Sequence, residues 1–494
     1  MDQKKPPNPL KRQRFTQKPQ IIKKLLYTRP KNPTMRARQE FSTCVSPGNP
    51  VALAPCLVAY TVIYEMHKFN SVYAMVKATR PEQPVYCLRP SAVTIATKWF
   101  QDNFPGRVLF AVKTNPEFVR TVFEAGLDHF DVASLGEIEL VNRVAPGARM
   151  SFMHPVKSRE AIRRAYFDYG VRDFSLDTQD ELDKILTETN EAQDLNLFVR
   201  ISVSNRHSNH SLAGKFGTRG KEAQRLLFRA RQYADKLGIC FHAGSQLMNP
   251  EAFRIAMQEA SALIIKSGVI IDIMDVGGGF PSVYPGLVPP PLKDYIKVIH
   301  ESFEESMVLE TCELWCEPGR ALVAEGASLV VKVELRKGNA LYLNDGTYGG
   351  LFDAGQPAMV YPVRKVSLFD PAVQMEEFSF FGPTCDSIDA MRGPFVLPAD
   401  IDEGDYIEID NMGAYSVSMR TAFNHFGECS QVIVDTVPAL SLYQGDADTL
   451  VPAMPASTAP GKAFQAGGAL VPLKNAKPGA NIKALKQETN HDAG

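Results

Sequence analysis

Long hydrophobic runs are missing from this 494-residue sequence. Its most apolar stretch, Val51 to Tyr64, is shorter than the roughly 20 residues that a membrane-spanning helix needs, and it contains Pro55. We therefore expect strand and turn structure there, and no membrane span. The first forty residues also lack the apolar core of a secretory signal, so we expect no signal peptide.

Cysteine is sparse and irregularly spaced. The eight cysteines form no regular framework, which argues against a disulfide-stapled scaffold and favours reduced thiols in a cytoplasmic compartment. Cys312 and Cys316 are the only close pair, and no second pair or HxxxH motif completes a zinc set. We interpret these two cysteines as packing residues.

An excess of one charge is also absent overall, because the formal net charge is −1. The balance is uneven, since residues 1–40 contain 12 Lys and Arg against 2 acidic residues; 12 − 2 gives +10, and the remaining chain sums to −11. Such an arm could bind nucleic acid or an acidic membrane surface, or act as a transit peptide. We expect residues 1–45 to be a solvated, disordered arm instead, with neither nucleic acid nor membrane as a partner.

What the sequence does contain is an ordinary globular composition, with 45% hydrophobic and 22% charged residues. From Val85 to Val323, short apolar runs alternate with longer amphipathic segments. The runs are VLFAVK, HFDVAS, RMSFMH, DFSLD, LNLFVRISV, GICFHAG, IDIMDVGGG and ELWCEPGR. Strand followed by helix, repeated about eight times over roughly 240 residues, is typical of a parallel (β/α)8 barrel, whose active sites lie at the carboxyl ends of the strands.

From about Ser328 the pattern changes to β-rich pieces such as SLVVKVELRKG, NALYLNDG and DYIEIDN. We predict an α/β protein with a (β/α)8 barrel over residues 88–327 and a C-terminal all-β domain over residues 328–440, to which residues 46–87 contribute. The final segment, residues 441–494, is rich in Pro, Ala and Gly, so we expect a disordered tail.

One lysine, Lys113 in FAVKTNPE, stands at the end of an apolar run that we expect to be a buried strand. An ammonium group is costly to desolvate there unless it has a partner or a chemical task. A lysine at the carboxyl end of a barrel strand is either an ion-pair anchor or a Schiff-base nucleophile whose pKa falls on burial. By itself, this motif favours the anchor.

Two further motifs follow apolar strands, and each has a simple structural explanation by itself. DVGGGFP places Gly277, Gly278 and Gly279 where bare backbone amides can approach a phosphate, although a tight turn would need the same residues. EPGR places Glu317 three residues before Arg320. These two form either a local ion pair, or an acid for a pyridinium nitrogen and a guanidinium fork for a phosphate.

FHAGSQ places His242 and Ser245 at another strand end, where a lone histidine is more often a core residue than a catalyst. Together, however, an amine nucleophile, a glycine loop, an acid and an arginine are what pyridoxal 5′-phosphate (PLP) requires. The ordered motifs are FAVKTNP, FDVASLGEIELV, KFG, FHAGSQ, DVGGGFP, EPGR, NDGTYGG, GPTCDSID and NMGAYS. Over residues 88–426 they resemble the fold type III PLP-dependent decarboxylases, and the ornithine decarboxylase group most closely.

The resemblance implies an alanine racemase-like barrel and a set of barrel residues. Lys113 would bind PLP covalently with help from Asp131. His242 would stack on the pyridine ring, and Glu317 would pair with the ring nitrogen as CO₂ leaves. The residues implied to hold the phosphate are Ser245, Gly277, Gly278, Gly279, Arg320 and Tyr415. Arg200 matches a strand arginine near the cofactor whose role is less defined.

The resemblance also implies tasks for the β domain. Cys385 would protonate the carbanion carbon, and Asp386 would meet the distal ammonium of the substrate, with Asp345 as a second carboxylate. Two acids around one cation make physical sense, because a buried ammonium needs full pairing. In the family, the residues at the first two positions reach into the partner subunit's barrel, which implies a homodimer with shared active sites. Lys215 and Asp389 are implied to form an ion pair between subunits.

Two positions depart from the family pattern. Ala243 stands where valine is commoner, and His154 stands where asparagine is usual, but neither change removes a chemical group that the site needs. His207 and His210 in NRHSNHSLAG lack a third metal ligand, so we expect no metal and a loop near the mouth of the active site.

These motifs predict a PLP-dependent decarboxylase of a basic L-amino acid, with L-ornithine converted to putrescine and CO₂ in polyamine biosynthesis as the first choice. Lysine, both lysine and ornithine, or arginine are alternative substrates, because two carboxylates recognise a cation without fixing its distance. Diaminopimelate fits less well, since the acid in GPTCDS would repel its distal carboxylate. A noncatalytic homologue that regulates a partner is the alternative of another class; loss of the lysine, the glycine loop or the cysteine would favour it, and all are present.

Overall fold

The computed structural model of the protein describes residues 66–204, 214–306, 308, 310–367 and 374–443. The predicted basic arm, the loop histidines His207 and His210, and residues 444–494 of the predicted tail lie outside the described residues. The expectations for those segments therefore stay predictions. Within the described ranges, the strands form two sheets of nine strands each.

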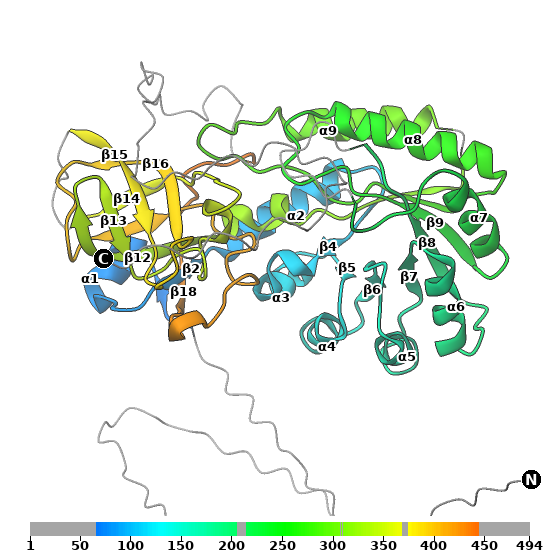
Figure 1. The fold of residues 1–494 in the computed structure, drawn as a ribbon, viewed down its shortest axis with the longest axis horizontal. Helices are drawn as coiled ribbons and strands as arrows, with labels where there is room; N and C mark the ends of the chain where they lie inside the picture. Colours follow the sequence, from blue (N-terminus) through cyan, green and yellow to red (C-terminus); the bar gives the residue numbers. More distant parts are fainter. Residues whose placement is uncertain (1–65, 205–213, 307, 309, 368–373, 444–494) are drawn as a thin grey trace, which may run out of the picture. The chain divides into compact units, whose positions relative to one another are not determined.

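The first sheet is parallel and forms the barrel, at the right of Figure 1, in the order β3, β11, β10, β9, β8, β7, β6, β5, β4. Its strands are β3 (Arg107–Val108), β4 (Phe110–Ala111), β5 (His129–Val132), β6 (Arg149–Phe152), β7 (Asp173–Leu176), β8 (Asn196–Arg200), β9 (Lys236–Cys240), β10 (Ile273–Asp275) and β11 (Glu313–Cys316). Only Leu109 separates β3, which pairs with β11, from β4, which pairs with β5, so these two are halves of one strand. The eight predicted runs supply one barrel strand each, and the predicted (β/α)8 barrel is confirmed.

Helices cover the outside of the barrel (Figure 1). They are α3 (Val119–Glu124), α4 (Leu135–Val144), α5 (Arg159–Phe167), α6 (Gln179–Glu188), α7 (Gly220–Arg231), α8 (Glu251–Ser267) and α9 (Leu292–Glu304), while α2 (Pro90–Asn103) precedes the first strand. The hydroxyls of Ser134, Ser158 and Thr178 accept hydrogen bonds from first-turn N–H groups of α4, α5 and α6. Those N–H groups have no partner within the helix, which is why these helices begin where the sequence offers Ser or Thr.

Apolar side chains fill the barrel interior. One cluster, at most 4% exposed, is Leu109, Met153, Phe198, Cys240, Ile273 and Trp315. The barrel is therefore a packed core and not a pore, which leaves the carboxyl ends of the strands as the place for a site. Cys312 and Cys316 are buried free thiols, which confirms their interpretation as packing residues.

The second sheet builds the β domain at the left of Figure 1. Its strands are β1 (Lys68–Phe69), β2 (Val85–Leu88), β12 (Ala327–Lys337), β13 (Ala340–Leu343), β14 (Val363–Val366), β15 (Met375–Phe381), β16 (Ala390–Pro398), β17 (Tyr406–Ile409) and β18 (Ser430–Val434), with α1 (Val72–Thr79) after β1. The three β-rich pieces singled out in the sequence form β12, β13 and β17. The predicted C-terminal β domain is therefore confirmed as part of the fold class.

The start of the barrel is tied to the β domain by a buried arginine. Arg89 directly follows β2, which pairs with β12 and β18, and its fully buried guanidinium contacts Glu408 at 2.8 Å and Asp410 at 2.5 Å. A guanidinium removed from water needs such partners, since breaking a buried pair costs about 3–5 kcal/mol. The division of the chain at residues 87 and 327 remains our proposal for its domains.

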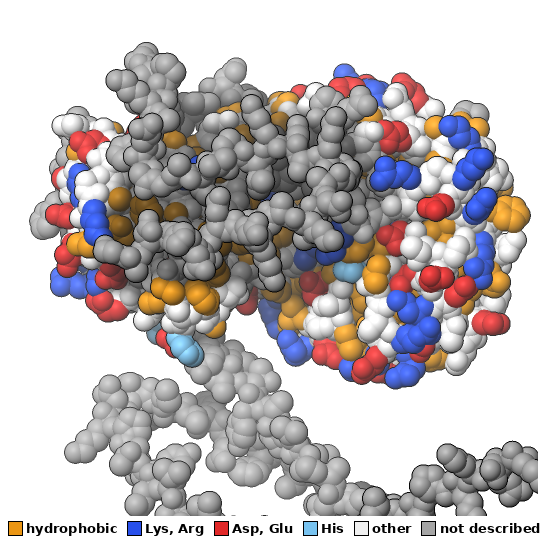
Figure 2. All heavy atoms as spheres, viewed as in Figure 1, with side chains coloured by type: hydrophobic (Ala, Val, Ile, Leu, Met, Phe, Trp, Pro, Cys, Tyr) orange, Lys and Arg blue, Asp and Glu red, His pale blue; other side chains and the backbone are white. Residues whose placement is uncertain are grey.

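The surface shows no dominant sign of charge in one view. In Figure 2, Lys and Arg side chains are interspersed with Asp and Glu over the barrel. Within the described ranges, no helix combines the length and the apolar character needed to cross a membrane. In the same part of the chain, no three His, Cys, Asp or Glu side chains gather in a way that could hold a metal ion.

Candidate active site

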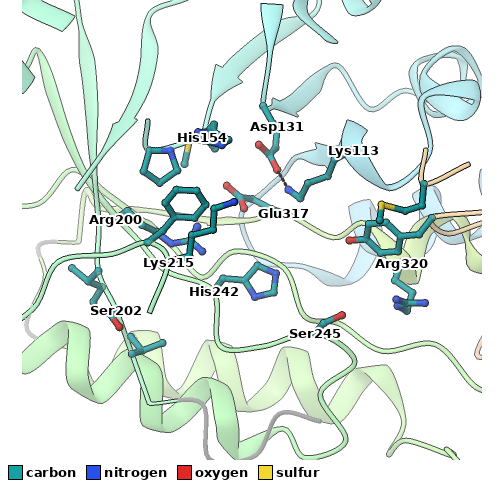
Figure 3. A pocket seen from close by; sticks show the side chains of 18 of the residues that line it. Lys113, Asp131, His154, Arg200, Ser202, Lys215, His242, Ser245, Glu317 and Arg320 are labelled. Carbon is teal, nitrogen blue, oxygen red and sulfur yellow. Dashed lines mark hydrogen bonds and ion pairs between the residues drawn. The ribbon is translucent and has the colours of Figure 1, made fainter. Parts of the chain in front are cut away.

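A cavity of about 670 Å³ opens at the carboxyl ends of the barrel strands. Figure 3 shows that its charged side chains come from different strand ends and point into a common space. The predicted site residues that line it are Lys113, Asp131, Arg200, His242, Ser245, Glu317, Arg320 and Tyr415. Gly278 and Gly279 line a small adjoining pocket that shares several of these residues. One chain therefore brings together nearly all of the predicted barrel residues.

Lys113 was predicted at the carboxyl end of a strand, and it lies just past that end, on the short 3₁₀ turn η1 (Val112–Thr114) that directly follows β4. Ala111 on β4 is in register with Asp131 on β5, and this pairing brings Lys113 Nζ to 2.5 Å from Asp131 Oδ2. The Lys113 side chain keeps 42% of its surface accessible because it faces the cavity. Desolvation by the surrounding protein opposes the charged form, but the carboxylates of Asp131 and Glu317 outweigh it and raise the pKa of Lys113. Asp131 therefore favours the charged ammonium and holds the Lys113 side chain in place at the cavity.

Glu317 directly follows β11 and is only 4% exposed. Burial, followed by the neighbouring Asp275 carboxylate, raises the pKa of Glu317 well above its ordinary value. Its Oε1 has no hydrogen-bond partner among the described residues. A buried, unpartnered carboxyl oxygen beside a cavity calls for a ligand donor, and a ring N–H is one.

His242 lies just beyond the end of β9 and borders the same cavity. Its Nδ1 accepts a hydrogen bond from the backbone N–H of Gly244 at 3.2 Å. Burial, together with the positive charges of Arg200 and Lys113, lowers the pKa of His242 to about 3. The imidazole is therefore neutral at physiological pH and offers an uncharged ring to an aromatic ligand.

The glycine loop after β10 needs glycine because the backbone of neighbouring loops approaches closely. At Gly277, which has a φ of +69°, a Cβ would lie 2.1 Å from the carbonyl oxygen of Phe241. At Gly279, with a φ of +107°, a Cβ would lie 2.4 Å from the carbonyl oxygen of Gly244. No larger residue fits at either position, and Gly278 lies between them with its backbone at the adjoining pocket.

Arg320 opens the short helix α10 (Arg320–Val323) and is 7% exposed. Its Nη2 donates to Asp353 at 2.8 Å, its Nη1 donates to the Tyr284 hydroxyl at 3.2 Å, and the Tyr415 ring lies 5.1 Å from the guanidinium carbon. Tyr415 has a φ of +64°, and its N–H is held by the carbonyl of Thr114. The Nε of Arg320 has no hydrogen-bond partner in the described part of the chain, so the arginine keeps a donor for an anion.

Three predicted β-domain residues do not line this cavity within the described chain. Cys385 is exposed, and Asp386 accepts a hydrogen bond from the Tyr348 hydroxyl at 2.6 Å. Asp345 is buried instead, with Arg420 nitrogens at 2.7 and 3.3 Å from its two oxygens. The chain by itself therefore separates the predicted β-domain residues from Lys113, and their roles stay predictions.

The predicted pair of Lys215 and Asp389 is also separate within one chain. Lys215 lines the cavity, with its ammonium 5.0 Å from the Phe216 ring. Asp389 is buried and accepts hydrogen bonds from the backbone and hydroxyl groups of Thr347 and Thr384. No ion pair joins Lys215 to Asp389 in the described ranges, and the predicted contact between subunits is untested.

The two departures from the family pattern lie where the sequence placed them. His154 lines the cavity, with its ring centroid 5.1 Å from that of Phe216 in an edge-to-face arrangement. Its Nδ1 accepts from the Val156 N–H, and burial lowers the pKa of His154, with Lys157 adding to the effect. Ala243 is buried beside the site. Neither residue displaces a group that the predicted chemistry uses.

Sequence reasoning missed four polar residues around the site. Asp353 lines the cavity and Thr114 lines the adjoining pocket, while Tyr284 contacts Arg320 and Asp275 contacts Gly277. Asp275 had a signal, because it directly precedes the glycine loop in DVGGG. Asp353 had none, since it follows NDGTYGG in a segment without strand periodicity, and only the fold brings it to Arg320.

The donor set fits PLP. Arg320 Nε and Thr114 Oγ1 are buried, lack partners among the described residues, and border the pocket of the glycine loop, where a phosphate would find donors. Glu317 Oε1 is the matching acceptor for a ring N–H. Lys113 supplies the amine that a covalently held aldehyde cofactor requires.

Comparison with known proteins gives the same family. Residues 91–324 match the family described as "Pyridoxal-dependent decarboxylase, pyridoxal binding domain". The lysine/ornithine decarboxylase of Selenomonas ruminantium is 30% identical over 341 residues, covering 67% of this chain and 84% of that protein. The ornithine decarboxylase of Panagrellus redivivus is 32% identical over 394 residues, covering 72% of this chain and 88% of that protein.

A solved structure extends the likeness to the whole described fold. The Paramecium bursaria Chlorella virus arginine decarboxylase bound to agmatine has a TM-score of 0.65 and 26% identity, and the match covers 73% of this chain and 98% of that one. The alanine racemase-like fold class and PLP as cofactor are thereby confirmed. The chain belongs to the fold type III pyridoxal-dependent decarboxylases, in the ornithine decarboxylase group.

Proposed function

We propose that the protein decarboxylates a basic L-amino acid, with L-ornithine, converted to putrescine and CO₂, as the preferred substrate. The observation that carries the proposal is the convergence of Lys113, Asp131, His242, Glu317 and Arg320 on one cavity. The proteins it resembles are named as decarboxylases of ornithine, lysine or arginine, which supports a basic substrate. A noncatalytic regulator would have no need of this complete set.

The barrel residues have distinct proposed roles. Bound PLP supplies an electron sink for the electron pair left when CO₂ departs. Lys113 would hold the cofactor covalently, with its side chain positioned by Asp131 at 2.5 Å. Glu317 Oε1 accepts the hydrogen bond of the ring nitrogen, while neutral His242 stacks on the ring.

A second group of residues is proposed to bind the phosphate and to balance the charges of the site. The residues proposed to hold the phosphate are Ser245, Gly277, Gly278, Gly279, Arg320 and Tyr415. Arg200, at the end of β8, favours the ionised forms of Glu317 and Asp275 by its positive charge. This gives the strand arginine an electrostatic role near the ring nitrogen.

We propose a homodimer in which the partner supplies Cys385 and Asp386 to the cavity. The two residues stand on an exposed part of the β domain, where Asn424 accepts the N–H of Cys385 and Tyr348 packs against Phe423 at 4.8 Å. Apolar side chains near them are exposed, with Phe423 at 40% and Ile388 at 55%. Exposed apolar surface beside reactive groups suits a subunit interface. In this arrangement Lys215 and Asp389 would meet across it.

Within this proposal Asp386 is the main ligand for the distal ammonium. Asp386 is half-buried, and the Tyr348 hydroxyl and the Ile388 N–H orient its carboxylate. Asp345 was predicted as a second carboxylate, but Arg420 already balances its charge. A single free carboxylate tolerates different chain lengths, because one methylene changes binding by only about 1–3 kcal/mol. Lysine, or lysine and ornithine together, are therefore the alternative substrates.

A competition assay tests the proposal. Enzyme loaded with PLP is offered equal concentrations of L-ornithine, L-lysine and L-arginine, and the released CO₂ and amines are quantified. We expect putrescine as the main product, some cadaverine, and no product from Lys113→Ala. If cadaverine or agmatine is the main product, lysine or arginine is the preferred substrate and the ornithine proposal is wrong. If none of the three amino acids releases CO₂, the enzymatic proposal is refuted.

We also propose a cytoplasmic location. The cysteines of the described residues, Cys87, Cys240, Cys312, Cys316, Cys385 and Cys429, are all free thiols. Thiols persist in this form in reducing compartments. Cys385 in particular must be a thiol to give a proton to a carbanion.

A further inference from the structure

Two buried carboxyl groups lie at the ends of neighbouring barrel strands, and one of them, Glu317, lines the cavity. Asp275 ends β10, and Glu317 directly follows the adjacent strand β11. Asp275 is 0% exposed and Glu317 is 4% exposed. The backbone of Gly277 joins them, because its N–H donates to Asp275 Oδ1 at 2.8 Å and its carbonyl accepts the N–H of Glu317 at 2.8 Å. We call these two side chains the carboxyl pair.

The inner oxygens of the carboxyl pair lack ordinary partners. Asp275 Oδ2 and Glu317 Oε1 are both buried, and no donor among the described residues reaches either. Both residues contact the backbone of Gly277, and the negative charge of Asp275 adds to burial in raising the pKa of Glu317. Two buried ionised carboxylates repel each other and cannot hydrogen-bond, since each is only an acceptor, whereas a carboxylic acid can donate to a carboxylate. One proton on the carboxyl pair would remove this repulsion.

The surrounding charges give the same count. The groups that influence the carboxyl pair are Asp131 on β5, Lys113 after β4, Arg200 on β8, and the thiols Cys240 and Cys316. His242 also lies close, with its Nε2 near Gly278, and is neutral. The three carboxyl groups of Asp131, Asp275 and Glu317 face the two cations, Lys113 and Arg200. One proton leaves 3 − 1 = 2 negative charges against two positive charges, so the buried cluster is neutral.

We propose that Asp275 is a positioning residue for Glu317, and that the carboxyl pair holds one proton in the cofactor-free protein and gives it up when a ring nitrogen binds at Glu317. If the ring nitrogen is unprotonated when it binds, the proton of the carboxyl pair passes to the ring nitrogen. If the ring nitrogen is already protonated, the proton of the carboxyl pair is released to solvent. In either case both carboxylates end ionised, and the positive ring nitrogen replaces the lost proton in the charge balance. The inference rests on the proposed cofactor role of Glu317 and extends it to Asp275.

Proton counting in Asp275→Asn tests the inference. The asparagine keeps an oxygen acceptor for the Gly277 N–H and offers an N–H donor to Glu317, which leaves Glu317 ionised with no proton to give. PLP is titrated calorimetrically into cofactor-free wild type and Asp275→Asn in buffers of different ionisation enthalpy. We expect the wild type to lose about one proton more per site than the variant. Equal proton numbers would overturn the inference.

An altered ligand supplies the matched control. A PLP analogue with C–H in place of the ring nitrogen carries no positive charge at that position. The shared proton should therefore stay on the carboxyl pair when the analogue binds. The difference in proton number between wild type and Asp275→Asn should then fall to zero. A difference that persists with the analogue would show that the proton comes from elsewhere and would overturn the assignment.

Infrared spectroscopy tests the wild type alone, should Asp275→Asn fail to fold. The cofactor-free protein should show the stretching band of a protonated carboxyl group that disappears when PLP binds and is absent from Glu317→Gln. Glu325, another buried acid, has its pKa raised to about 7 by burial, but it lies outside the cavity lining and its band should persist. If no band is lost on binding, the inference fails while the cofactor site stands. If wild type shows no saturable PLP binding, the proposed function fails with it.

Discussion

The barrel cavity and the β-domain surface around Cys385 differ in how they gather predicted site residues. Barrel residues converge within one chain, because the carboxyl ends of parallel strands share one edge of the sheet. In the β domain, Cys385 is exposed, Asp386 is half-buried, and neither lines that cavity. The difference teaches that parallel barrel strands bring their site residues together within one chain, whereas the loops of the mixed β sheet leave Cys385 and Asp386 apart from them.

A second contrast lies within the β domain. Asp345 and Asp386 were predicted to act alike, yet Asp345 is buried against Arg420 and backbone amides, whereas Asp386 is half-buried and accepts hydrogen bonds from the Tyr348 hydroxyl and the Ile388 N–H. A buried paired acid supports the fold, while a partly exposed one can still take a ligand. The two positions should therefore respond differently to mutation.

The largest expected effect concerns the barrel alone. Lys113→Ala removes the amine that holds PLP, so we expect kcat to fall by at least about 10³-fold. Borohydride reduction followed by peptide mass spectrometry should attach PLP to Lys113 in the wild type and to no lysine in the variant. Lys215→Ala, which removes another lysine of the same cavity, should keep the label. PLP recovered on a different lysine would contradict the assignment.

The proposed dependence of the β-domain residues on a partner subunit would be wrong if one chain were sufficient for activity. Mixing inactive Lys113→Ala with inactive Cys385→Ala should restore about a quarter of wild-type activity, because random exchange makes half of the dimers mixed, each with one intact site. Activity is measured before and after exchange, with mass-tagged subunits to prove that mixing occurred. Mixed dimers that remain inactive would count against shared sites.

Asp345 tests the structural side of the β domain. Asp345→Ala leaves the Arg420 guanidinium without its carboxylate at a side-chain exposure of 13%, so we expect a loss of about 3–5 kcal/mol in the free energy of unfolding. Urea unfolding measures it. Asp345→Ala with Arg420→Ala should be less destabilised than the sum of the two single variants. Full additivity would show that the pair does not couple.

Asp386 tests the ligand-binding side. Asp386→Ala should lower kcat/KM for ornithine by about 2 kcal/mol, the scale of one lost charged contact, while the unfolding free energy and the spectrum of bound PLP stay as in the wild type. Steady-state kinetics with ornithine and lysine provide the measurement. Unchanged ornithine kinetics in a folded, dimeric variant would remove Asp386 from substrate recognition.

The smallest effect is a pH dependence in the barrel. The pKa of His242 is lowered from 6.5 to about 3, so its neutral form adds stability that is present above pH 6.5 and is lost as the pH falls toward 3. Between pH 7 and pH 5 the cofactor-free wild type should lose up to about 2 kcal/mol more unfolding free energy than His242→Gln. His300→Gln, on the exposed face of α9, serves as the control. Equal losses in wild type and His242→Gln would contradict the shift.

Much of the fold was predictable because its signals are local. Each barrel strand is a short apolar run, and the alternation with amphipathic helices identifies a parallel sheet without any contact information. Lys113 was placed at a strand end, but β4 stops at Ala111 and the lysine falls on the turn η1. The end of a strand depends on backbone pairing across the sheet, which a single run of residues does not reveal.

The candidate site also has features that were predictable from the sequence and features that were not. The sequence determined which barrel side chains would meet, since Lys113, Glu317 and the glycine loop follow strands of one parallel sheet and Asp131 lies near the end of another. Only the tertiary structure decided how the charged groups are paired: Asp353 reaches Arg320, Arg420 binds Asp345, and the Gly277 backbone contacts both Asp275 and Glu317. The reason is physical. Strand ends are set by local periodicity, whereas the partner of a buried charge is whatever group the completed packing brings within a few ångströms.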